Sequence, residues 1–249
     1  MKFFALAIAF AALLLSACVS EETRTGLAIS RTEPDLLEAA KANTSLAMEY
    51  AVQGKSDLAL EKITRALAQN DDYQPAQAAA ALIHARRGDD AEAVAHFRRA
   101  ISLNPADIST RNNYGVYLCD QGKSEQALEL LISAASDHNY TSAAKAWTDA
   151  GICARRTGDL PNAIEHFRRA LQIEPDQPEA LLQMAAISAQ NKDWLRVRAF
   201  LQRRERVAKP NAECLKLAIE SERELGDADA AEAYRQKLRR NFPEASGPG

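Results

Sequence analysis

The stretch AKAWTDAGICARRTGDLPNAIEHFRRALQIEP, residues 144–175, decides the fold class of this chain. Gly158, near its middle, is predicted to end one helix in a left-handed conformation. Pro161 falls in the first turn of the next helix, where its missing N–H costs nothing. Small residues on both sides let the two helices approach closely, and Trp147 and Phe167 fill the gaps between them. The stretch therefore predicts a helix–turn–helix unit.

The same unit recurs along the chain. Six turn positions lie 34, 34, 36, 34 and 34 residues apart: Gly54, Gly88, Gly122, Gly158, Lys192 and Gly226. This period resembles that of tetratricopeptide repeats, whose helix pairs stack into a superhelix because one pair cannot bury its apolar face alone. No stretch shows the alternating pattern of β-strands. We predict an all-α fold, a right-handed superhelix (an α-solenoid) of about six tetratricopeptide repeats over residues 34–245.

Repeats five and six depart from the pattern of the others. Lys192 replaces the turn glycine, and we expect Asn191 to take the left-handed position, which asparagine tolerates. Arg204 stands where a small residue is expected, which leaves the packing between repeats five and six unpredicted. Terminal repeats often differ in this way because they cap the stack.

The N-terminal residues resemble a bacterial lipoprotein signal. A positive start is followed by an apolar run over residues 3–15, which is too short to span a membrane, and then by Leu-Ser-Ala-Cys at 15–18. The resemblance implies cleavage before Cys18 and acylation of its sulfur and of its new N-terminus. The alternative is an ordinary signal peptide with an incidental cysteine. We expect a signal peptide at 1–17, a lipidated flexible tether at 18–33 and a disordered tail at 246–249.

The expected anchor also predicts where the protein resides. Several acyl chains on Cys18 would hold the protein stably on a membrane, because each buried methylene contributes about 0.8 kcal/mol. Val19 follows the cysteine, at the position where aspartate implies retention at the inner membrane. By this sorting habit of lipoproteins, we expect the periplasmic face of the outer membrane.

One stripe of each first helix is a candidate binding surface. The second, fifth, ninth and twelfth positions are 3, 4 and 3 residues apart, share one helix face and should line the concave groove. Large apolar residues at the ninth position would form an apolar floor with a polar rim, as a groove for a partner segment needs. Alternatively, the ninth position is half-buried against the second helix for stability. The predicted groove consists of Met48, Leu82, Asn112, Val116, Thr148, Ile152 and Arg155.

Three cysteines remain besides Cys18. Cys119 and Cys153 lie at the twelfth and tenth positions of neighbouring first helices, so their heights differ by about half a turn and a bridge is within reach. The periplasm is oxidising, and we predict a disulfide between them. The alternative is two buried thiols that serve as small apolar residues. Cys214 has no partner left and is expected to be structural.

Patterns of catalytic and metal-binding residues are missing from the sequence. His96 and His166 occupy the same repeat position in the string HFRRA, which indicates a structural role. No His/Cys cluster has metal-ligand spacing, no glycine loop suits a phosphate, and no serine lies in a nucleophile elbow. We expect no enzymatic activity, no catalytic residue, no metal and no cofactor. The formal charge of −3 gives no indication of a nucleic-acid partner.

Several strings resemble the type IV pilus biogenesis and stability lipoproteins of the PilF/PilW family. They are NNYGVYLC at 112–119, GIC at 151–153, NAIEHFRRAL at 162–171 and NFP at 241–243. The order of lipoprotein signal, tether and six repeats is also similar, and the resemblance covers nearly the whole mature chain. The resemblance implies a pilotin of the outer membrane, which promotes localisation or multimerisation of the pilus secretin and hence twitching motility.

A different adaptor role fits the same features. A repeat lipoprotein that docks peptidoglycan hydrolases or the outer-membrane assembly machinery would share the anchor and the groove and differ in its partner. The expected partners are therefore the pilus secretin or another periplasmic or outer-membrane protein, together with the membrane through the acyl chains on Cys18.

Overall fold

The computed structural model describes residues 35–245, and within them every regular element is a helix. The predicted all-α fold class is confirmed. The helices are α1 (Leu36–Val52), α2 (Ser56–Gln69), α3 (Gln74–Arg87), α4 (Asp90–Leu103), α5 (Ile108–Asp120), α6 (Ser124–Ala135), α7 (Ala143–Arg156), α8 (Leu160–Ile173), α9 (Pro178–Gln190), α10 (Trp194–Glu205), α11 (Ala212–Glu224), α12 (Ala228–Asn241) and the short 3-10 helix η1 (Pro243–Ala245).

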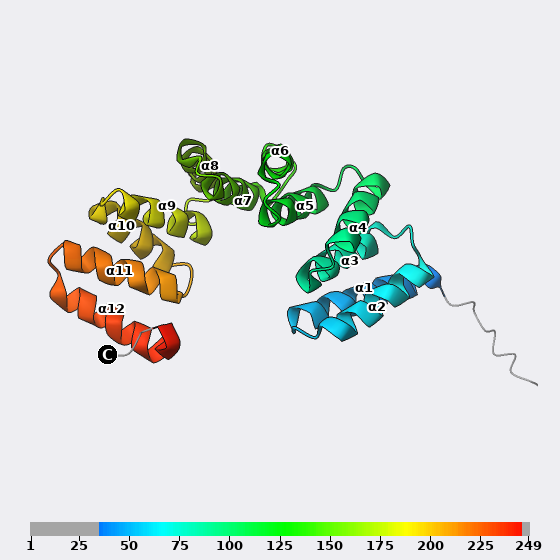
Figure 1. The fold of residues 1–249 in the computed structure, drawn as a ribbon, viewed down its shortest axis with the longest axis horizontal. Helices are drawn as coiled ribbons and strands as arrows, with labels where there is room; N and C mark the ends of the chain where they lie inside the picture. The colour runs from blue at the N-terminus through cyan, green and yellow to red at the C-terminus, as the bar shows by residue number, and fades with distance from the viewer. Residues whose placement is uncertain (1–34, 246–249) are drawn as a thin grey trace, which may run out of the picture. The chain divides into compact units, whose positions relative to one another are not determined.

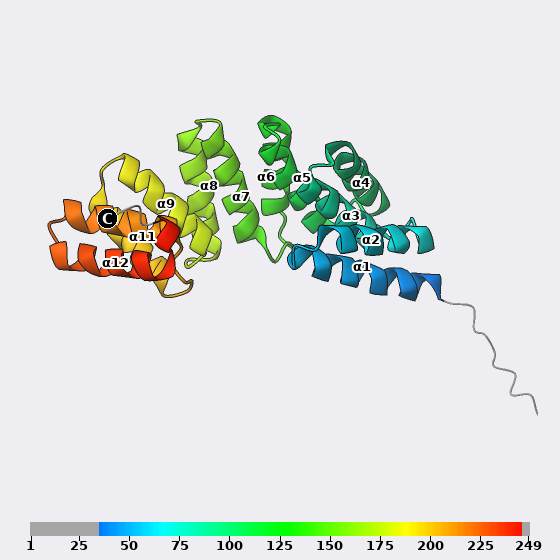
Figure 2. The same ribbon diagram turned by 60° about the horizontal axis from the view of Figure 1, so that its bottom comes forward.

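The α-helices form six antiparallel pairs, here called repeats one to six. Each α-helix packs against the next one along the chain, and each odd-numbered helix also packs against the following odd-numbered helix. The first helices of the repeats (α1, α3, α5, α7, α9 and α11) therefore form one continuous row. Figures 1 and 2 show the pairs following one another in chain order, from the blue and cyan α1 and α2 to the orange and red α11 and α12.

All six first helices end in the same way. A residue with positive φ follows each helix, and the next N–H donates to the carbonyl five residues back, as Asp89 does to His84 at 3.0 Å. This is the Schellman arrangement, which satisfies carbonyls that the helix leaves open. In repeat five the left-handed residue is Lys192, with φ 57°, whereas Asn191 has φ −87°. The prediction that Asn191 takes this position was wrong.

Small residues in the first helices make room for large ones in the second. Phe97, Leu131 and Phe167 are fully buried. A Cβ atom added at Gly151 would lie 2.5 Å from a ring carbon of Phe167, and any Cβ at that distance clashes. Ala-rich and Gly-containing helix faces thus bring α7 and α8 close enough for the phenylalanine ring to fill the space between them.

The junction between repeats five and six uses polar groups instead. Arg204, at the position where a small residue was expected, is 8 % exposed, and its Nη1 donates to the backbone carbonyl of Lys209 at 3.1 Å. Glu222 is 4 % exposed and accepts from Arg198 Nε at 2.9 Å. Burial of charged groups is tolerated here because hydrogen bonds replace part of the lost hydration.

Candidate functional site

A groove crosses the first helices of repeats one, two and three. Its volume is about 480 Å³, and its walls come from α1, from α3 with the residue before it, and from the N-terminal half of α5 with Asp107 before it. Because the three helices pack side by side, the groove runs across them and is open to solvent along its length. It is lined by Lys41, Thr44, Ser45, Met48, Tyr73, Gln74, Pro75, Ala78, Ala79, Leu82, Asp107, Ser109, Thr110 and Asn113.

The floor of this groove is apolar. Met48 and Leu82, two of the large apolar residues predicted at the ninth position, line it together with Ala78 and Ala79. Both large side chains are half-buried, because one side of each packs on the repeat core and the other faces the groove. Met48 and Leu82 therefore fit both alternatives for the ninth position, because each is half-buried within its repeat and also lines the groove. The apolar side chains of a partner could cover the exposed parts of Met48 and Leu82.

The other predicted floor residues lie outside this cavity. Val116 packs against the same core cluster as Leu82, and Ile152 packs against the cluster of repeats three and four. Both are half-buried, and neither lines the groove. Arg155, in the last turn of α7, is also half-buried and does not line it.

Two predicted rim residues are buried. Asn112 and Thr148 are each 1 % exposed, so their place in the groove rim was predicted wrongly. Asn112 Nδ2 donates to Asp149 Oδ2 at 3.3 Å, and Thr148 Oγ1 donates to the carbonyl of Ala144 at 2.8 Å. In repeats three and four the fifth position of the first helix is therefore buried and does not reach the groove.

A hydrogen-bonded cluster forms one end of the groove. Asp107 accepts from Gln74 Nε2 at 2.7 Å, from Thr110 Oγ1 at 2.6 Å and from the backbone N–H of Ser109 at 3.1 Å. Burial alone would raise the pKa of Asp107, but the hydrogen bonds from Thr110, Gln74 and the backbone outweigh it, and the pKa is lowered. The carboxylate is therefore charged and fixed at the groove end, where it caps α5.

Sequence reasoning missed this polar end. The predicted stripe used the second, fifth, ninth and twelfth positions of each first helix, whereas Asp107 precedes α5 and Gln74 is the first residue of α3. The signal that was available is an aspartate at an N-cap two residues after a proline, Pro105.

A disulfide joins the first helices of repeats three and four. Cys119 of α5 and Cys153 of α7 are paired, with 5.8 Å between their Cα atoms and a sequence separation of 34. The Cα separation lies within the range that a disulfide requires. Cys214 is a buried free thiol, and burial raises its pKa. The disulfide fixes the spacing of α5 and α7 in the row of first helices.

Cys18 and the predicted signal peptide and tether lie outside the described residues, as does the predicted tail at 246–249. Within residues 35–245, no helix is long and apolar enough to cross a membrane. In the same part of the chain, no group of three or more His, Cys, Asp or Glu side chains could hold a metal ion.

Comparison with known families covers most of the chain. A tetratricopeptide repeat model matches residues 31–191. The chain belongs to the tetratricopeptide repeat family. The model of the middle tetratricopeptide-repeat-like domain of cilia and flagella-associated protein 70 also matches residues 139–246.

Individual tetratricopeptide repeat proteins match over nearly their full length. The type IV pilus assembly protein PilF of Pseudomonas aeruginosa is 24 % identical over 229 residues, which cover 92 % of this chain and 90 % of PilF. The crystal structure of PilW, a widely conserved type IV pilus biogenesis factor, is 27 % identical with a TM-score of 0.71 and covers 82 % of this chain and 94 % of PilW. A structure of P. aeruginosa PilF is 25 % identical with a TM-score of 0.73 and covers 83 % and 93 % of the two chains. The resemblance to PilF and PilW predicted from the sequence is confirmed.

Proposed function

We propose that this tetratricopeptide repeat protein is a lipid-anchored adaptor of type IV pilus biogenesis, a pilotin on the periplasmic face of the outer membrane. In this proposal it promotes localisation or multimerisation of the pilus secretin. The observation that carries the pilus role is the homology to PilF over 92 % of this chain. Non-enzymatic scaffolding fits the repeat architecture, since stacked helix pairs present extended binding surfaces.

The groove of repeats one to three is the proposed binding surface for the secretin segment. Met48 and Leu82 offer apolar contact, while Lys41, Gln74 and Asn113 offer polar groups along the edges. An amphipathic partner segment could bury its apolar side on the floor and satisfy its polar groups at the rim. Acyl chains on Cys18 would then keep the bound secretin at the membrane, which raises its effective concentration for assembly.

A charged substitution in the groove floor tests the binding surface. We expect Leu82→Glu to abolish heat-resistant secretin multimers in outer-membrane fractions, because the carboxylate would be placed against the apolar segment of the partner. The matched control is Leu195→Glu, which changes a leucine of α10 that is 67 % exposed and lies outside the groove. Circular dichroism must show equal helicity in both variants. Normal multimers in a folded Leu82→Glu variant would exclude the groove as the secretin site.

The role of the anchor is tested separately. Cells that lack the protein are expected to lose the secretin multimer, and a Cys18→Ala variant is expected to restore it poorly, since the repeats would no longer be concentrated at the membrane. An unchanged, correctly localised multimer in cells without the protein would exclude the secretin role altogether. Peptidoglycan hydrolases or the outer-membrane assembly machinery would then be the partners to test.

A further inference from the structure

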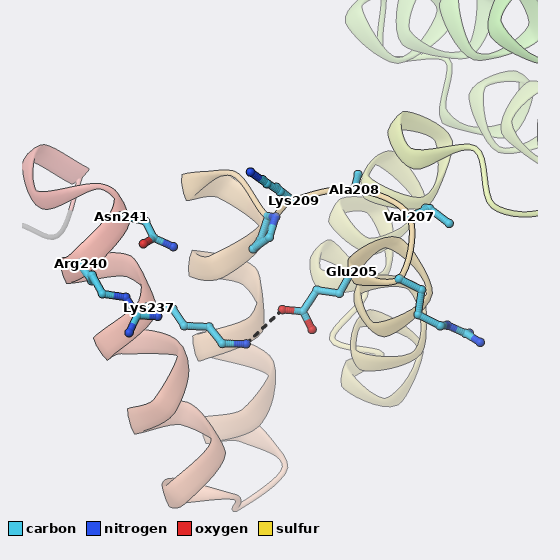
Figure 3. Close-up of a pocket in the computed structure, with 9 residues that line it drawn as sticks. Glu205, Val207, Ala208, Lys209, Lys237, Arg240 and Asn241 are labelled. Atoms are coloured by element: carbon cyan, nitrogen blue, oxygen red, sulfur yellow. Dashed lines mark hydrogen bonds and ion pairs between the residues drawn. The ribbon is translucent and has the colours of Figure 1, made fainter.

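A second open cleft lies at the C-terminal end of the repeats, and the proposed function does not use it. Its volume is about 630 Å³, and it is formed by the loop between α10 and α11 together with the last turns of α12. Figure 3 shows Lys237, Arg240 and Asn241 on α12, with Glu205 and the loop opposite them. The lining residues are Glu205, Arg206, Val207, Ala208, Lys209, Pro210, Lys237, Arg240 and Asn241.

The cleft is strongly basic although the chain as a whole is acidic. Its lining contains four cationic side chains and one carboxylate, which gives a formal charge of +3, against −3 for the whole chain. Lys237 Nζ pairs with Glu205 Oε1 at 3.4 Å across the cleft. Arg206, Lys209 and Arg240 form no salt bridge within residues 35–245. Three cations therefore remain available to an anionic ligand.

The single negative charge of Glu205 is paired with Lys237, so Arg206, Lys209 and Arg240 have no carboxylate partner in the cleft. One oxygen of the Glu205 carboxylate faces Lys237, and the other accepts from the hydroxyl of Tyr234 at 3.3 Å. Burial, with the charge of Glu205, raises the pKa of Tyr234 to about 12, so this hydroxyl stays protonated and continues to donate. The single carboxylate of the cleft is thus held by groups of the protein itself.

The loop that carries the basic side chains is fixed in position. Arg204, buried beneath it, donates from Nη1 to the carbonyl of Lys209 at 3.1 Å. The backbone N–H groups of Val207 and Ala208 donate to the carbonyl of Arg204 at 3.1 and 2.9 Å. This accounts for an arginine at a position where the repeat pattern requires a small residue. A loop held in one conformation loses less entropy when a ligand binds.

The cleft also has an apolar edge. Val207 is 49 % exposed and is followed by Ala208, with Pro210 closing the loop. A ligand that matches the whole surface therefore needs several negative charges beside an apolar group. A single phosphate would satisfy the cations only in part and would leave Val207 exposed.

We propose that this cleft binds an acidic segment of a partner protein, with carboxylates on Arg206, Lys209 and Arg240 and an apolar side chain on Val207. Charged hydrogen bonds between carboxylates and guanidinium or ammonium groups are about twice as strong as neutral ones. The site is in repeat six and its adjoining loop, so it does not depend on the groove of repeats one to three. A protein with both sites would hold two segments at once.

The test measures fluorescence anisotropy with the full chain carrying Cys18→Ser, which prevents acylation. The probe is a fluorescein-labelled, amidated peptide of the sequence Asp-Leu-Asp-Glu-Leu-Asp, and its Asn/Gln counterpart is the neutral control. We expect binding of the acidic peptide alone, weakened by salt, because screening reduces charge–charge attraction. Lys209→Glu combined with Arg240→Glu should weaken it at least tenfold.

The matched control for charge is Arg98→Glu with Arg168→Glu. Both arginines are exposed, lie on α4 and α8, and give the same change in net charge. We expect less than a twofold effect on peptide binding, and Leu82→Glu should also leave it unchanged. If Lys209→Glu with Arg240→Glu reduces helicity, Lys209→Gln with Arg240→Gln replaces it, with an expected loss of at least fivefold.

Three results would overturn the proposal. Equal loss in both double variants would mean that the peptide follows net charge and has no specific site. No measurable binding of the acidic peptide at low salt would exclude the cleft as an acidic-peptide site. Binding to vesicles of phosphatidylglycerol that requires Lys209 and Arg240, without peptide binding, would assign the cleft to a lipid surface. None of these results changes the expected effect of Leu82→Glu on the secretin.

Discussion

Repeats three and four (α5–α8) and repeats five and six (α9–α12) share one backbone plan but are held together by different interactions. In the first region, a disulfide joins α5 to α7, and Gly151 packs directly against the ring of Phe167. In the second region the cysteine is free, and buried positions are taken by Arg204 and Glu222. All repeats thus share the turn geometry, whereas the contacts between their helices are apolar, covalent or polar.

Several buried polar side chains of the second region form hydrogen bonds inside the protein. Ser221 is fully buried, and its hydroxyl donates to the carbonyl of Trp194 at 3.0 Å. Unsatisfied buried polar groups cost about 1–3 kcal/mol each, so these hydrogen bonds are needed for folding. Another hydrogen bond, from Arg204 Nη1 to the carbonyl of Lys209, holds the α10–α11 loop, which carries the exposed Arg206 and Lys209.

Loss of the disulfide should produce the largest difference in stability between the two regions. Replacing Cys119 and Cys153 by alanine opens a loop of 34 residues, and the chain-entropy model gives a loss of about 3–4 kcal/mol. Because each repeat contacts only its neighbours, we expect native-state hydrogen exchange to show this loss in α5–α8 more than in α9–α12. Cys214→Ala is the control. Equal loss of protection in all repeats would mean that the solenoid unfolds as one unit.

Loss of the buried ion pair between Arg198 and Glu222 should instead destabilise the second region. Glu222→Gln removes the charged partner of Arg198, whose Nε lies 2.9 Å from the carboxylate, and should destabilise α9–α12 by about 1.5–3 kcal/mol. Glu220→Gln, at an exposed position of the same helix, should change little. Urea denaturation of both variants gives the difference in unfolding free energy. If the two variants were equally stable, the ion pair would contribute nothing to repeats five and six.

Much of the fold follows from the sequence because turn geometry is local. The six predicted turn positions, from Gly54 to Gly226, all have positive φ. The period also placed Met48 and Leu82 on the groove face. It failed for Asn112 and Thr148, because periodicity gives the direction of a side chain from its own helix but not how far the neighbouring helix covers it.

The polar junction was beyond sequence reasoning for a related reason. Arg204 interrupts the pattern of small residues, and its acceptor is a backbone carbonyl at Lys209, which no residue type reveals. Asp107 was likewise missed because its partners Gln74 and Thr110 come from two different repeats. Such contacts depend on how neighbouring repeats stack. The period predicts that the repeats stack, but not which side chains then meet.

Acidification should destabilise the repeats that contain His96 and His166 more than repeats five and six. Burial, followed by the positive charge of Arg169, lowers the pKa of His166 below 6.5, and burial with the charge of His84 does the same for His96. The folded state then binds fewer protons than the unfolded state, so this stability is complete above about pH 6.5 and decreases as the pH falls through that value. We expect repeats two and four to lose protection between about pH 7.5 and 5.5, and repeats five and six, which contain no histidine, to keep it.

The control for this pH response is His166→Gln. It should remove the response of repeat four and leave that of repeat two, as measured by hydrogen exchange corrected for the intrinsic rates at each pH. A response of equal size in α9–α12 would point to carboxylates and not to the histidines.

The smallest expected effect concerns the turn itself, the feature that all six repeats share. Lys192 has φ 57°, a left-handed conformation that costs a residue with a side chain about 1–2 kcal/mol. Glycine removes this cost but adds unfolded-state entropy worth about 0.5–1 kcal/mol, so Lys192→Gly should stabilise repeat five by about 0.5 kcal/mol. Gly158→Lys, at the matching turn of repeat four, should destabilise that repeat by a similar amount.

The two tryptophans allow the effects of Lys192→Gly and Gly158→Lys on stability to be measured separately in each region. Trp147 lies in α7 and Trp194 in α10, so a Trp147→Phe background reports on repeat five and a Trp194→Phe background on repeat four. Opposite shifts of the two urea midpoints would show that the turn contributes to the difference between the regions. If neither midpoint moved, the turns would be equivalent in energy, and the difference would rest on the disulfide and on the polar junction alone.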